Sequence, residues 1–297
     1  MNLVISANDK YITPAKVMLT SFMLNNPQEM HSVYFIYNAV QEENLKELET
    51  LVNHYRARFI PILVDENSFS GFIQTERFPI NVYFRLLIPY YLEETEDRAL
   101  WMDVDLVVNK SLEVFYYQPF DGKYLIACRD VGAQDRPALF GCPDGTAYIN
   151  SGVLLINAAA MRKIPLSEYY RFCSKYKDVI LWPDQDILNG MFAPHIKALD
   201  NNLYNCQVTM SLKYHNLQTA RETIPVVHFV GANKPWHLKY YLAAGEVWDY
   251  YYLITSNKSA LYSFAYRSSR YILRFCNRCI VPFVHAIRRW VKNIISQ

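Results

Sequence analysis

The sequence predicts an α/β fold with a doubly wound, mostly parallel sheet, followed by a basic helical tail. Three observations support this prediction. Short apolar runs typical of buried strands alternate with amphipathic segments typical of helices. One apolar run, residues 99–102, ends in two aspartates one residue apart, Asp103 and Asp105, and open α/β sheets bind ligands at the carboxyl ends of their strands. After residue 257 there are eight Lys and Arg residues and no Asp or Glu.

The first part of the chain alternates strands and helices. Thr13 and Pro14 predict the start of a helix that ends near residue 25, because Thr caps helices and Pro suits the first helical position. The segment 41–54 has its leucines on one side and predicts an amphipathic helix. The strands expected around these helices are residues 2–7, 33–37 and 59–64.

The rest of the body continues this pattern. We expect further strands at residues 106–108, 124–128, 149–157 and 225–230. We expect helices at residues 81–91, 158–163, 165–176, 183–192 and 240–254, and a short one from Ser111. The long segment 131–147 predicts a lid or an acceptor-binding loop, because long loops in compact domains are usually functional.

Composition and charge restrict the class of protein. The near-neutral total hides an acidic body, with a net charge of −6 before residue 258, and a basic tail. No run is long enough to cross a bilayer, and Asn8 to Lys10 interrupt the N-terminal apolar stretch too early for a signal peptide. No G-x-G-x-x-G follows the first strand, and Cys276-x-x-Cys279 lacks a second pair for zinc. We expect a cytoplasmic protein with reduced thiols.

Asp103 and Asp105 present a physical problem that a metal ion would solve. Two carboxylates at the end of a buried strand cannot both stay unpaired, because an isolated buried charge costs several kcal/mol. A divalent cation with oxygen ligands would pair with both and would bind substrate phosphates. A tight polar turn, in which the aspartates cap the next element, is the other interpretation. The spacing alone leaves both open.

Four fragments together resemble a known family. They are Asp103-Val-Asp105, residues 150–157, residues 184–189 and residues 228–236. Their order and spacing resemble the retaining glycosyltransferases of family 8, which include bacterial lipopolysaccharide galactosyl- and glucosyltransferases and glycogenin. The resemblance covers about residues 1–250. It implies a GT-A nucleotide-diphospho-sugar transferase fold, a Rossmann-like α/β/α sandwich, for a catalytic domain at residues 1–257.

The resemblance implies a metal site made by Asp103, Asp105 and His228. The ion would be Mn²⁺, with Mg²⁺ as the alternative. It would bridge the two phosphates of a UDP-sugar and take up charge as UDP leaves. Carboxylate oxygens with one imidazole suit Mn²⁺ better than Ca²⁺. His228 alone, on an apolar strand, would more often be a core histidine.

The resemblance also implies donor-binding residues. Ala7, Asn8 and Tyr11 match the loop in which the family holds uracil and ribose, although Asn8-Asp9 stands where some bacterial members have two aspartates. Tyr11 offers a stacking face, and helix-entry packing is its alternative. The other donor-binding residues are Val104, Asn150, Gly231 and Lys234. Gly231 would let the backbone approach a phosphate, and Lys234 would supply a charge.

Three residues are expected to act at the reacting sugar. Asp184 would hold sugar hydroxyls, and Gln185 would lie under the reacting carbon. An amide oxygen is a poor nucleophile, so same-face attack through a short-lived oxocarbenium ion is favoured over attack by Gln185. Arg85 would clamp the diphosphate or the sugar, with a solvated helix cation as the alternative. Asp130 lies near the position of another sugar-binding carboxylate in some members.

The tail, residues 258–297, predicts a membrane-associating segment. Drawn as a helix over 262–295, it gathers its cations within about 100°, with Ile272, Phe275 and Trp290 among the apolar residues opposite. This pattern is typical of interfacial helices that prefer anionic lipid, and Pro282 would break the helix. A helix pair packed on the body with a solvated basic face is the alternative. Nucleic acid is not expected, because the apolar face is too large. The cations of this strip are Arg267, Arg270, Arg274, Arg278, His285, Arg288, Arg289 and Lys292.

Together these features predict a retaining hexosyltransferase. It would move glucose or galactose from UDP to a saccharide or glycolipid acceptor in cell-envelope biosynthesis, of the lipopolysaccharide or capsule type, at the cytoplasmic face of the membrane. The alternative is a non-catalytic, membrane-attached UDP-sugar binding protein. A metal-dependent phosphohydrolase is the third hypothesis.

Overall fold

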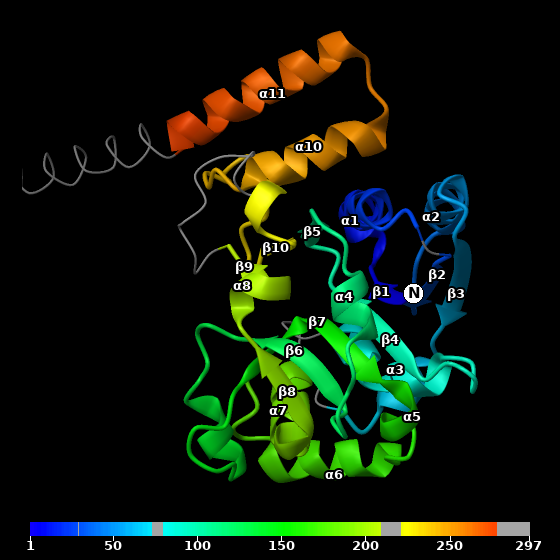
Figure 1. Ribbon diagram of the computed structural model, residues 1–297, viewed down its shortest axis with the longest axis vertical. Helices are drawn as coiled ribbons and strands as arrows, with labels where there is room; N and C mark the ends of the chain where they lie inside the picture. The colour runs from blue at the N-terminus through cyan, green and yellow to red at the C-terminus, as the bar shows by residue number, and fades with distance from the viewer. Residues whose placement is uncertain (29, 73–79, 209–220, 278–297) are drawn as a thin grey trace, which may run out of the picture.

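Two β-sheets form the centre of the protein (Figure 1). A computed structural model describes residues 1–28, 30–72, 80–208 and 221–277. The main sheet has seven strands in the order β3-β2-β1-β4-β7-β6-β8, and β7 runs antiparallel to β4 and β6 while the other neighbours pair in parallel. This confirms the predicted α/β fold. The strands are β1 (Asn2–Ser6), β2 (Ser32–Tyr37), β3 (Arg58–Leu63), β4 (Arg98–Met102), β6 (Leu125–Arg129), β7 (Ile149–Asn157) and β8 (Ile196–Leu199).

A smaller sheet stands beside the main one, in the strand order β5-β10-β9. β10 (Val226–His228) pairs antiparallel with β5 (Leu106–Val108) and parallel with β9 (Cys206–Gln207). The chain passes from β4 in the main sheet to β5 in the smaller sheet through residues 103–105 alone. The two aspartates therefore lie at the junction of the sheets.

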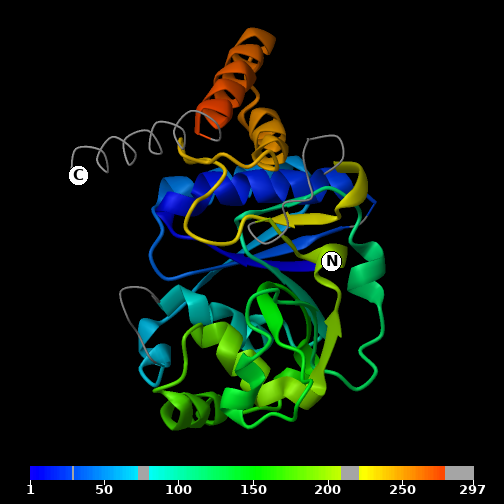
Figure 2. The same ribbon diagram turned by 90° about the vertical axis from the view of Figure 1, so that its left-hand side faces the viewer.

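Helices cover both faces of the main sheet, which makes an α/β/α sandwich (Figure 2). α1 (Ile12–Asn25) and α2 (Glu42–His54) pack on one face, against strand residues such as Leu3 and Phe35. On the other face, the cluster around Trp101 includes residues of four helices. These are α3 (Phe84–Tyr91), α5 (Ala158–Met161), α6 (Leu166–Tyr176) and α7 (Pro183–Phe192). Two short helices complete the body, namely α4 (Glu113–Tyr117) and α8 (Asn201–Tyr204).

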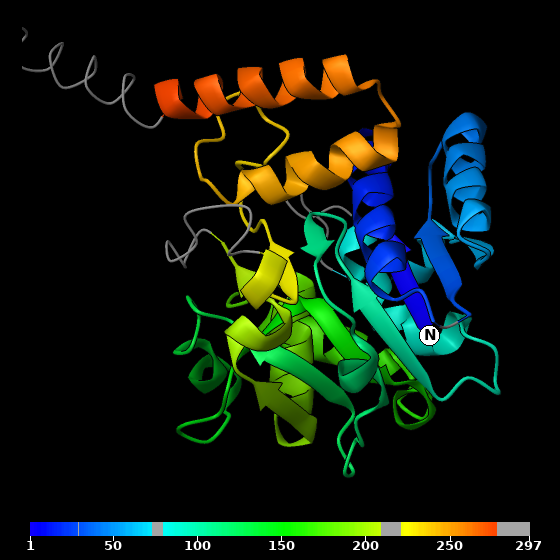
Figure 3. The same ribbon diagram turned by 45° about the horizontal axis from the view of Figure 1, so that its top comes forward.

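Two further helices lie above the smaller sheet. α10 (Gly245–Ser256) packs its Val247 and Trp248 into a cluster with Val227 of β10. α11 (Ala260–Phe275) runs antiparallel beside α10 (Figure 3). Among the residues that the structure describes, no helix is long and apolar enough to cross a membrane.

The structure moves two predicted helix starts. α1 begins at Ile12, so Thr13 is not its N-cap, because Asn8 instead caps a preceding 3₁₀ turn by accepting a hydrogen bond from the Lys10 N–H at 3.1 Å. The helix expected from residue 240 begins at Gly245. β8, β9 and α8 were not predicted, because these elements are too short for a periodic apolar pattern.

The described part of the tail is oriented differently from the prediction. Arg270 and Arg274, which were placed on a basic face toward lipid or solvent, are each 5% exposed and pair with Asp249 of α10. Apolar side chains cover the exposed face instead, with Phe264 67% and Phe275 54% exposed. The buried Asp249 carboxylate explains the difference, because it needs cationic partners. The rest of the predicted helix, residues 278–297, lies outside the described residues.

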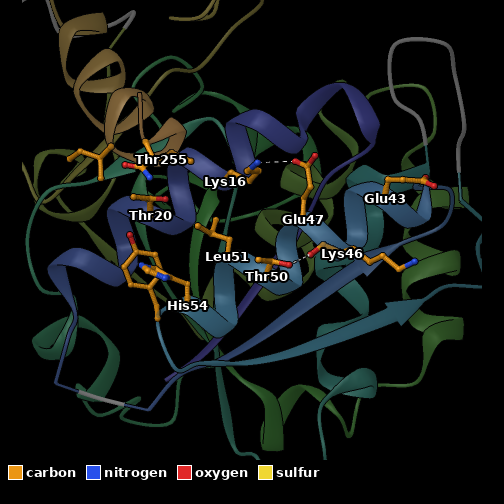
Figure 4. Close-up of a pocket in the computed structure, with 12 residues that line it drawn as sticks. Lys16, Thr20, Glu43, Lys46, Glu47, Thr50, Leu51, His54 and Thr255 are labelled. Atoms are coloured by element: carbon orange, nitrogen blue, oxygen red, sulfur yellow. Dashed lines mark hydrogen bonds and ion pairs between the residues drawn. The ribbon is translucent and has the colours of Figure 1, made fainter. Parts of the chain in front are cut away.

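An open groove of about 780 Å³ lies between α1, α2 and the end of α10 (Figure 4). Its charged side chains pair locally, with Lys16 2.8 Å from Glu47 and Lys46 2.6 Å from Glu42. None of the predicted site residues lines this groove.

Candidate active site

Asp103 and Asp105 lie at the carboxyl end of β4, beside the carboxyl end of β1. β1 and β4 are parallel neighbours, so Ala7 and Asn8 follow β1 at the same edge. The Asp103 N–H donates to the Gly152 carbonyl at 2.8 Å, and the Phe229 N–H donates to the Asp105 carbonyl at 2.9 Å. The aspartates are thus held between β7 and β10. Val104 was predicted to contact the donor, but its side chain packs into the hydrophobic core.

His228, the last residue of β10, faces the two aspartates. Its Nε2 lies 3.2 Å from Asp105 Oδ1 and 3.9 Å from Asp103 Oδ2. One ligand atom from each of the three residues lies within 4.8 Å of the others. Two carboxylates and one imidazole at this spacing fit a divalent cation such as Mn²⁺. The structure therefore brings together the three predicted ligands.

Asn205 fixes the orientation of His228. His228 Nδ1 lies 2.8 Å from Asn205 Oδ1, while Asn205 Nδ2 donates to Asn150 Oδ1 at 2.9 Å. Because Oδ1 can only accept, Nδ1 carries a proton, and Nε2 is the ring nitrogen that faces the aspartates. Gly152 makes room for this ring, since a Cβ there would come within 2.3 Å of His228 Cε1.

The same hydrogen bonds extend to the predicted sugar site. Asn150 Nδ2 donates to Asp130 Oδ2 at 2.9 Å, and Gln185 Nε2 donates to the same oxygen at 3.3 Å. Asn150, Asp130 and Gln185 thus form one network with Asn205 and His228. Asn205 was not predicted, because it stands before the unpredicted strand β9 and in no recognisable motif.

Arg85 connects the metal-site residues with the sugar-site residues. Its Nη2 lies 3.0 Å from Asp103 Oδ1 and its Nε 3.1 Å from Asp184 Oδ2. Its Nη1 donates to the Ser151 carbonyl at 2.7 Å, and the guanidinium covers the Trp101 ring at 4.8 Å. The residue is buried, so the alternative of a solvated helix cation is wrong. Its predicted contact with the donor stays a prediction.

Asp184 and Gln185 lie in the first turn of α7, against Ser151 of β7. Ser151 Oγ donates to Asp184 Oδ2 at 2.7 Å, and the Ser151 N–H donates to Gln185 Oε1 at 3.0 Å. Sequence reasoning missed Ser151, because serine in an Asn-Ser-Gly stretch also suits an ordinary turn. Ser151 sets the position of both predicted sugar-site side chains.

A buried ion pair fixes the start of α7. Asp186 accepts from Arg136 Nε at 2.8 Å and from the backbone N–H groups of Leu181 and Trp182, at 2.7 and 3.0 Å. Tyr148 also donates its hydroxyl proton to Asp186. Arg136 belongs to the segment 131–147, so this segment is anchored to α7 next to Gln185.

The loop after β10 brings Lys234 to the aspartates. Lys234 Nζ contacts the Asp105 carboxylate and donates to the Phe229 carbonyl at 2.8 Å. Gly231 has a φ of 89°, which favours glycine. In the same loop, Trp236 meets Tyr11 edge-on, with ring centroids 5.9 Å apart.

The two aspartates have different electrostatic environments. Burial raises the pKa of Asp103, and the neighbouring Asp105 adds to this effect, although Arg85 opposes it. Burial also opposes ionisation of Asp105, but His228 and Lys234 outweigh it and hold its pKa below the usual range. Asp105 therefore favours its ionised form more strongly than Asp103 does.

The fold and the site place the protein among the α/β glycosyltransferases of the GT-A type. A solved galactosyltransferase, LgtC in complex with donor and acceptor sugar analogues, superimposes with a TM-score of 0.75 at 23% identity, covering 91% of this chain and all of that one. The model of the family described as glycosyl transferase family 8 matches residues 2–239. The chain belongs to this family.

Curated relatives agree with this assignment. A lipopolysaccharide 1,2-glucosyltransferase of Escherichia coli is 28% identical over 242 residues, which cover 77% of this chain and 71% of the relative. A lipopolysaccharide 1,3-galactosyltransferase of Salmonella typhimurium is 23% identical over 252 residues, which cover 80% of this chain and 73% of the relative. The two relatives carry different hexoses in their names, so similarity leaves the sugar open.

Proposed function

We propose that the protein is a retaining, metal-dependent transferase of glucose or galactose from UDP to a saccharide or glycolipid acceptor of the cell envelope. The observation that carries the proposal is the convergence of Asp103, Asp105 and His228 beside Asp184 and Gln185. The lipopolysaccharide glycosyltransferases among the relatives support the type of acceptor.

In this proposal the chain's own residues bind and orient the donor. Asp103, Asp105 and His228 would hold Mn²⁺ or Mg²⁺, which would supply Lewis acidity to the leaving diphosphate. Lys234, already against Asp105, adds a positive charge beside that position. Asn8 and Tyr11 lie after β1 at the same edge and would bind the uridine. Asp184 would accept hydrogen bonds from sugar hydroxyls.

Gln185 supports the same-face route to retention. Its Oε1 accepts from the Ser151 N–H at 3.0 Å and lies 3.4 Å from Ser151 Oγ. An amide oxygen that already accepts hydrogen bonds is a weaker nucleophile than a free one, and an amide is a weak nucleophile to begin with. We therefore propose that Gln185 positions the sugar and does not form a covalent bond to it.

We also propose that the protein associates peripherally with the cytoplasmic face of the membrane through α11 and the sequence after it. The exposed face of α11 is apolar, and exposed apolar patches of this kind mark interaction surfaces. The following residues 278–297 add cations and no acidic residue, which favours anionic lipid over a protein partner. The apolar residues of this face are Leu261, Phe264, Tyr271, Ile272 and Phe275.

Thermal unfolding with nucleotides tests the donor site directly. A ligand that binds only the native state raises the apparent stability. We expect UDP and one UDP-hexose to raise the melting temperature only when Mn²⁺ or Mg²⁺ is present. The variants Asp103→Asn and Asp105→Asn should lose this shift and the transferase activity, while the exposed control Asp178→Asn keeps both.

The outcomes separate the three hypotheses. Transfer of hexose to a saccharide acceptor, with release of UDP, supports the proposal. Binding of the UDP-hexose without turnover supports the non-catalytic binding protein instead. Release of free sugar at a rate that no acceptor changes supports the phosphohydrolase. A full nucleotide shift with metal chelated would contradict the metal site itself.

A further inference from the structure

We infer that α11 positions the proposed donor site, because its Arg270 holds the loop 231–237 that carries Lys234 and Trp236. The inference rests on the proposed function for the identity of the donor. It assigns to the first part of the basic tail a role in positioning the loop, beside any role at a membrane. Arg270 and Arg274 are positioning residues, since both act through other residues.

Arg270 binds the loop through two backbone carbonyls. Its Nη1 donates to the His237 carbonyl at 3.3 Å, and its Nη2 donates to the Pro235 carbonyl. These two carbonyls stand on either side of Trp236. The planar guanidinium has fixed donor directions, so it holds both carbonyls at once in a way that a lysine cannot.

The loop transmits this contact to the donor site. The Lys234 N–H donates to His237 Nδ1 at 3.2 Å, and the His237 N–H donates to the Lys234 carbonyl at 2.9 Å. These two hydrogen bonds close the turn on itself. At one end Lys234 meets Asp105, and in the middle Trp236 meets Tyr11. Arg270 thus sets the position of side chains predicted at the phosphates and at the uridine.

Arg274 and Asp249 fix Arg270 in turn. Asp249 Oδ1 lies 3.5 Å from Arg270 Nε, and Asp249 Oδ2 lies 2.5 Å from Arg274 Nη1. Gly245 leaves room for Arg274 at the start of α10, since a Cβ there would lie 2.6 Å from Arg274 Nη2. All three charged side chains are buried. Two arginines share one carboxylate, so N–H groups of Arg270 remain free to bind the carbonyls.

The matched pair Arg270→Met and Arg267→Met tests the inference in the full-length protein in detergent, without lipid. Arg267 lies one turn earlier on α11 and is exposed, so both variants remove one positive charge from the same helix. Hydrogen exchange of the ligand-free protein measures the loop, and calorimetric titration with UDP and Mn²⁺ measures the donor site.

We expect Arg270→Met to weaken UDP binding about tenfold, the effect of losing one charge-assisted hydrogen bond. The Lys234 and His237 amides should exchange faster, and the donor KM should rise more than kcat falls. Arg267→Met should match the native protein in all three measurements. Arg270→Lys, which keeps the charge beside Asp249 but cannot span both carbonyls, should fall between the native protein and Arg270→Met.

Two results would overturn the inference. One is native UDP affinity and native loop exchange in Arg270→Met. The other, which decides the question if Arg270→Met does not fold, is a native affinity and exchange rate in Arg270→Lys. If the native protein itself binds no UDP, the proposed function fails, while loop exchange still reports whether Arg270 holds the loop.

Discussion

Two regions of the molecule combine carboxylates with cationic side chains, but in opposite proportions. At the junction of the sheets, the carboxylates Asp103, Asp105 and Asp184 outnumber the cations Arg85 and Lys234. Between α10 and α11, the carboxylate of Asp249 meets two arginines. The first region therefore has a surplus of negative charge and the second a surplus of positive charge.

This difference determines what each region can bind. A surplus of carboxylates, with an imidazole nitrogen facing them, suits a divalent cation from outside the chain. In the second region two guanidinium nitrogens of Arg270 find partners within the chain, the carbonyls of Pro235 and His237. One region is thus arranged to receive a ligand, and the other is arranged to hold part of the first in place.

Among the substitutions that test this comparison, we expect Gly152→Ala, at the junction of the sheets, to have the largest effect. The new Cβ would lie 2.3 Å from His228 Cε1, so the imidazole must leave the aspartates. We expect loss of Mn²⁺ binding and of transfer, with an otherwise folded protein. Electron paramagnetic resonance titration of Mn²⁺ and circular dichroism measure the two effects. Native Mn²⁺ affinity in this variant would show that His228 is not a ligand.

A smaller effect is expected for Asn205→Ala. His228 keeps its place, but its Nδ1 loses the acceptor that fixes the proton. Removing such a partner of a metal ligand typically lowers metal affinity about 10- to 100-fold. The same Mn²⁺ titration measures this, with Asn53→Ala on the exposed side of α2 as the control. Equal Mn²⁺ affinities in the two variants would show that Asn205 does not support metal binding.

The smallest effect is expected for the double variant Phe264→Ser and Phe275→Ser, which tests whether the outer face of α11 is independent of its inner arginines. Loss of two exposed aromatic side chains should weaken binding to anionic vesicles about tenfold. Donor affinity should not change. Vesicle flotation measures the first and UDP titration the second. The matched control replaces Leu63 and Val114, which are 66% and 78% exposed elsewhere on the body.

Unchanged flotation in the aromatic variant, or an equal loss in the control, would exclude α11 as the membrane-binding face. A loss of donor affinity in the aromatic variant would show that the two faces of the helix are not independent.

Asp103 and Asp105 could be predicted to lie together because their pattern is local. Asp103 and Asp105 stand one residue apart directly after the buried strand β4, and Val104 between them packs into the core. His228 and Asp184 were assigned through their motifs, and the fold brings them to the same edge. Asn205 and Ser151 were not found, because an isolated polar residue carries no sign of the partner that it will contact.

The orientation of α11 could not be predicted for a related reason. Its sequence shows two faces, but an amphipathic pattern does not say which face meets the body. The arginines turned inward because Asp249 lies buried on another helix, and nothing in the sequence of α10 marks that aspartate as unpaired without α11. A surplus of basic residues in a tail thus indicates a need for anions or hydrogen-bond acceptors in general. A buried carboxylate and backbone carbonyls can meet this need as well as lipid can.

The spacing of the two inward arginines has a geometric consequence. Arg270 and Arg274 are four residues apart, about one turn and 6 Å of rise, and both reach the same carboxylate. A slide of α11 by one turn would carry one of them out of range, so the helix is fixed in translation as well as in rotation. The outer face of α11 is therefore held at a constant offset from the candidate metal ligands, so any surface that this face contacts would lie at a set distance from them.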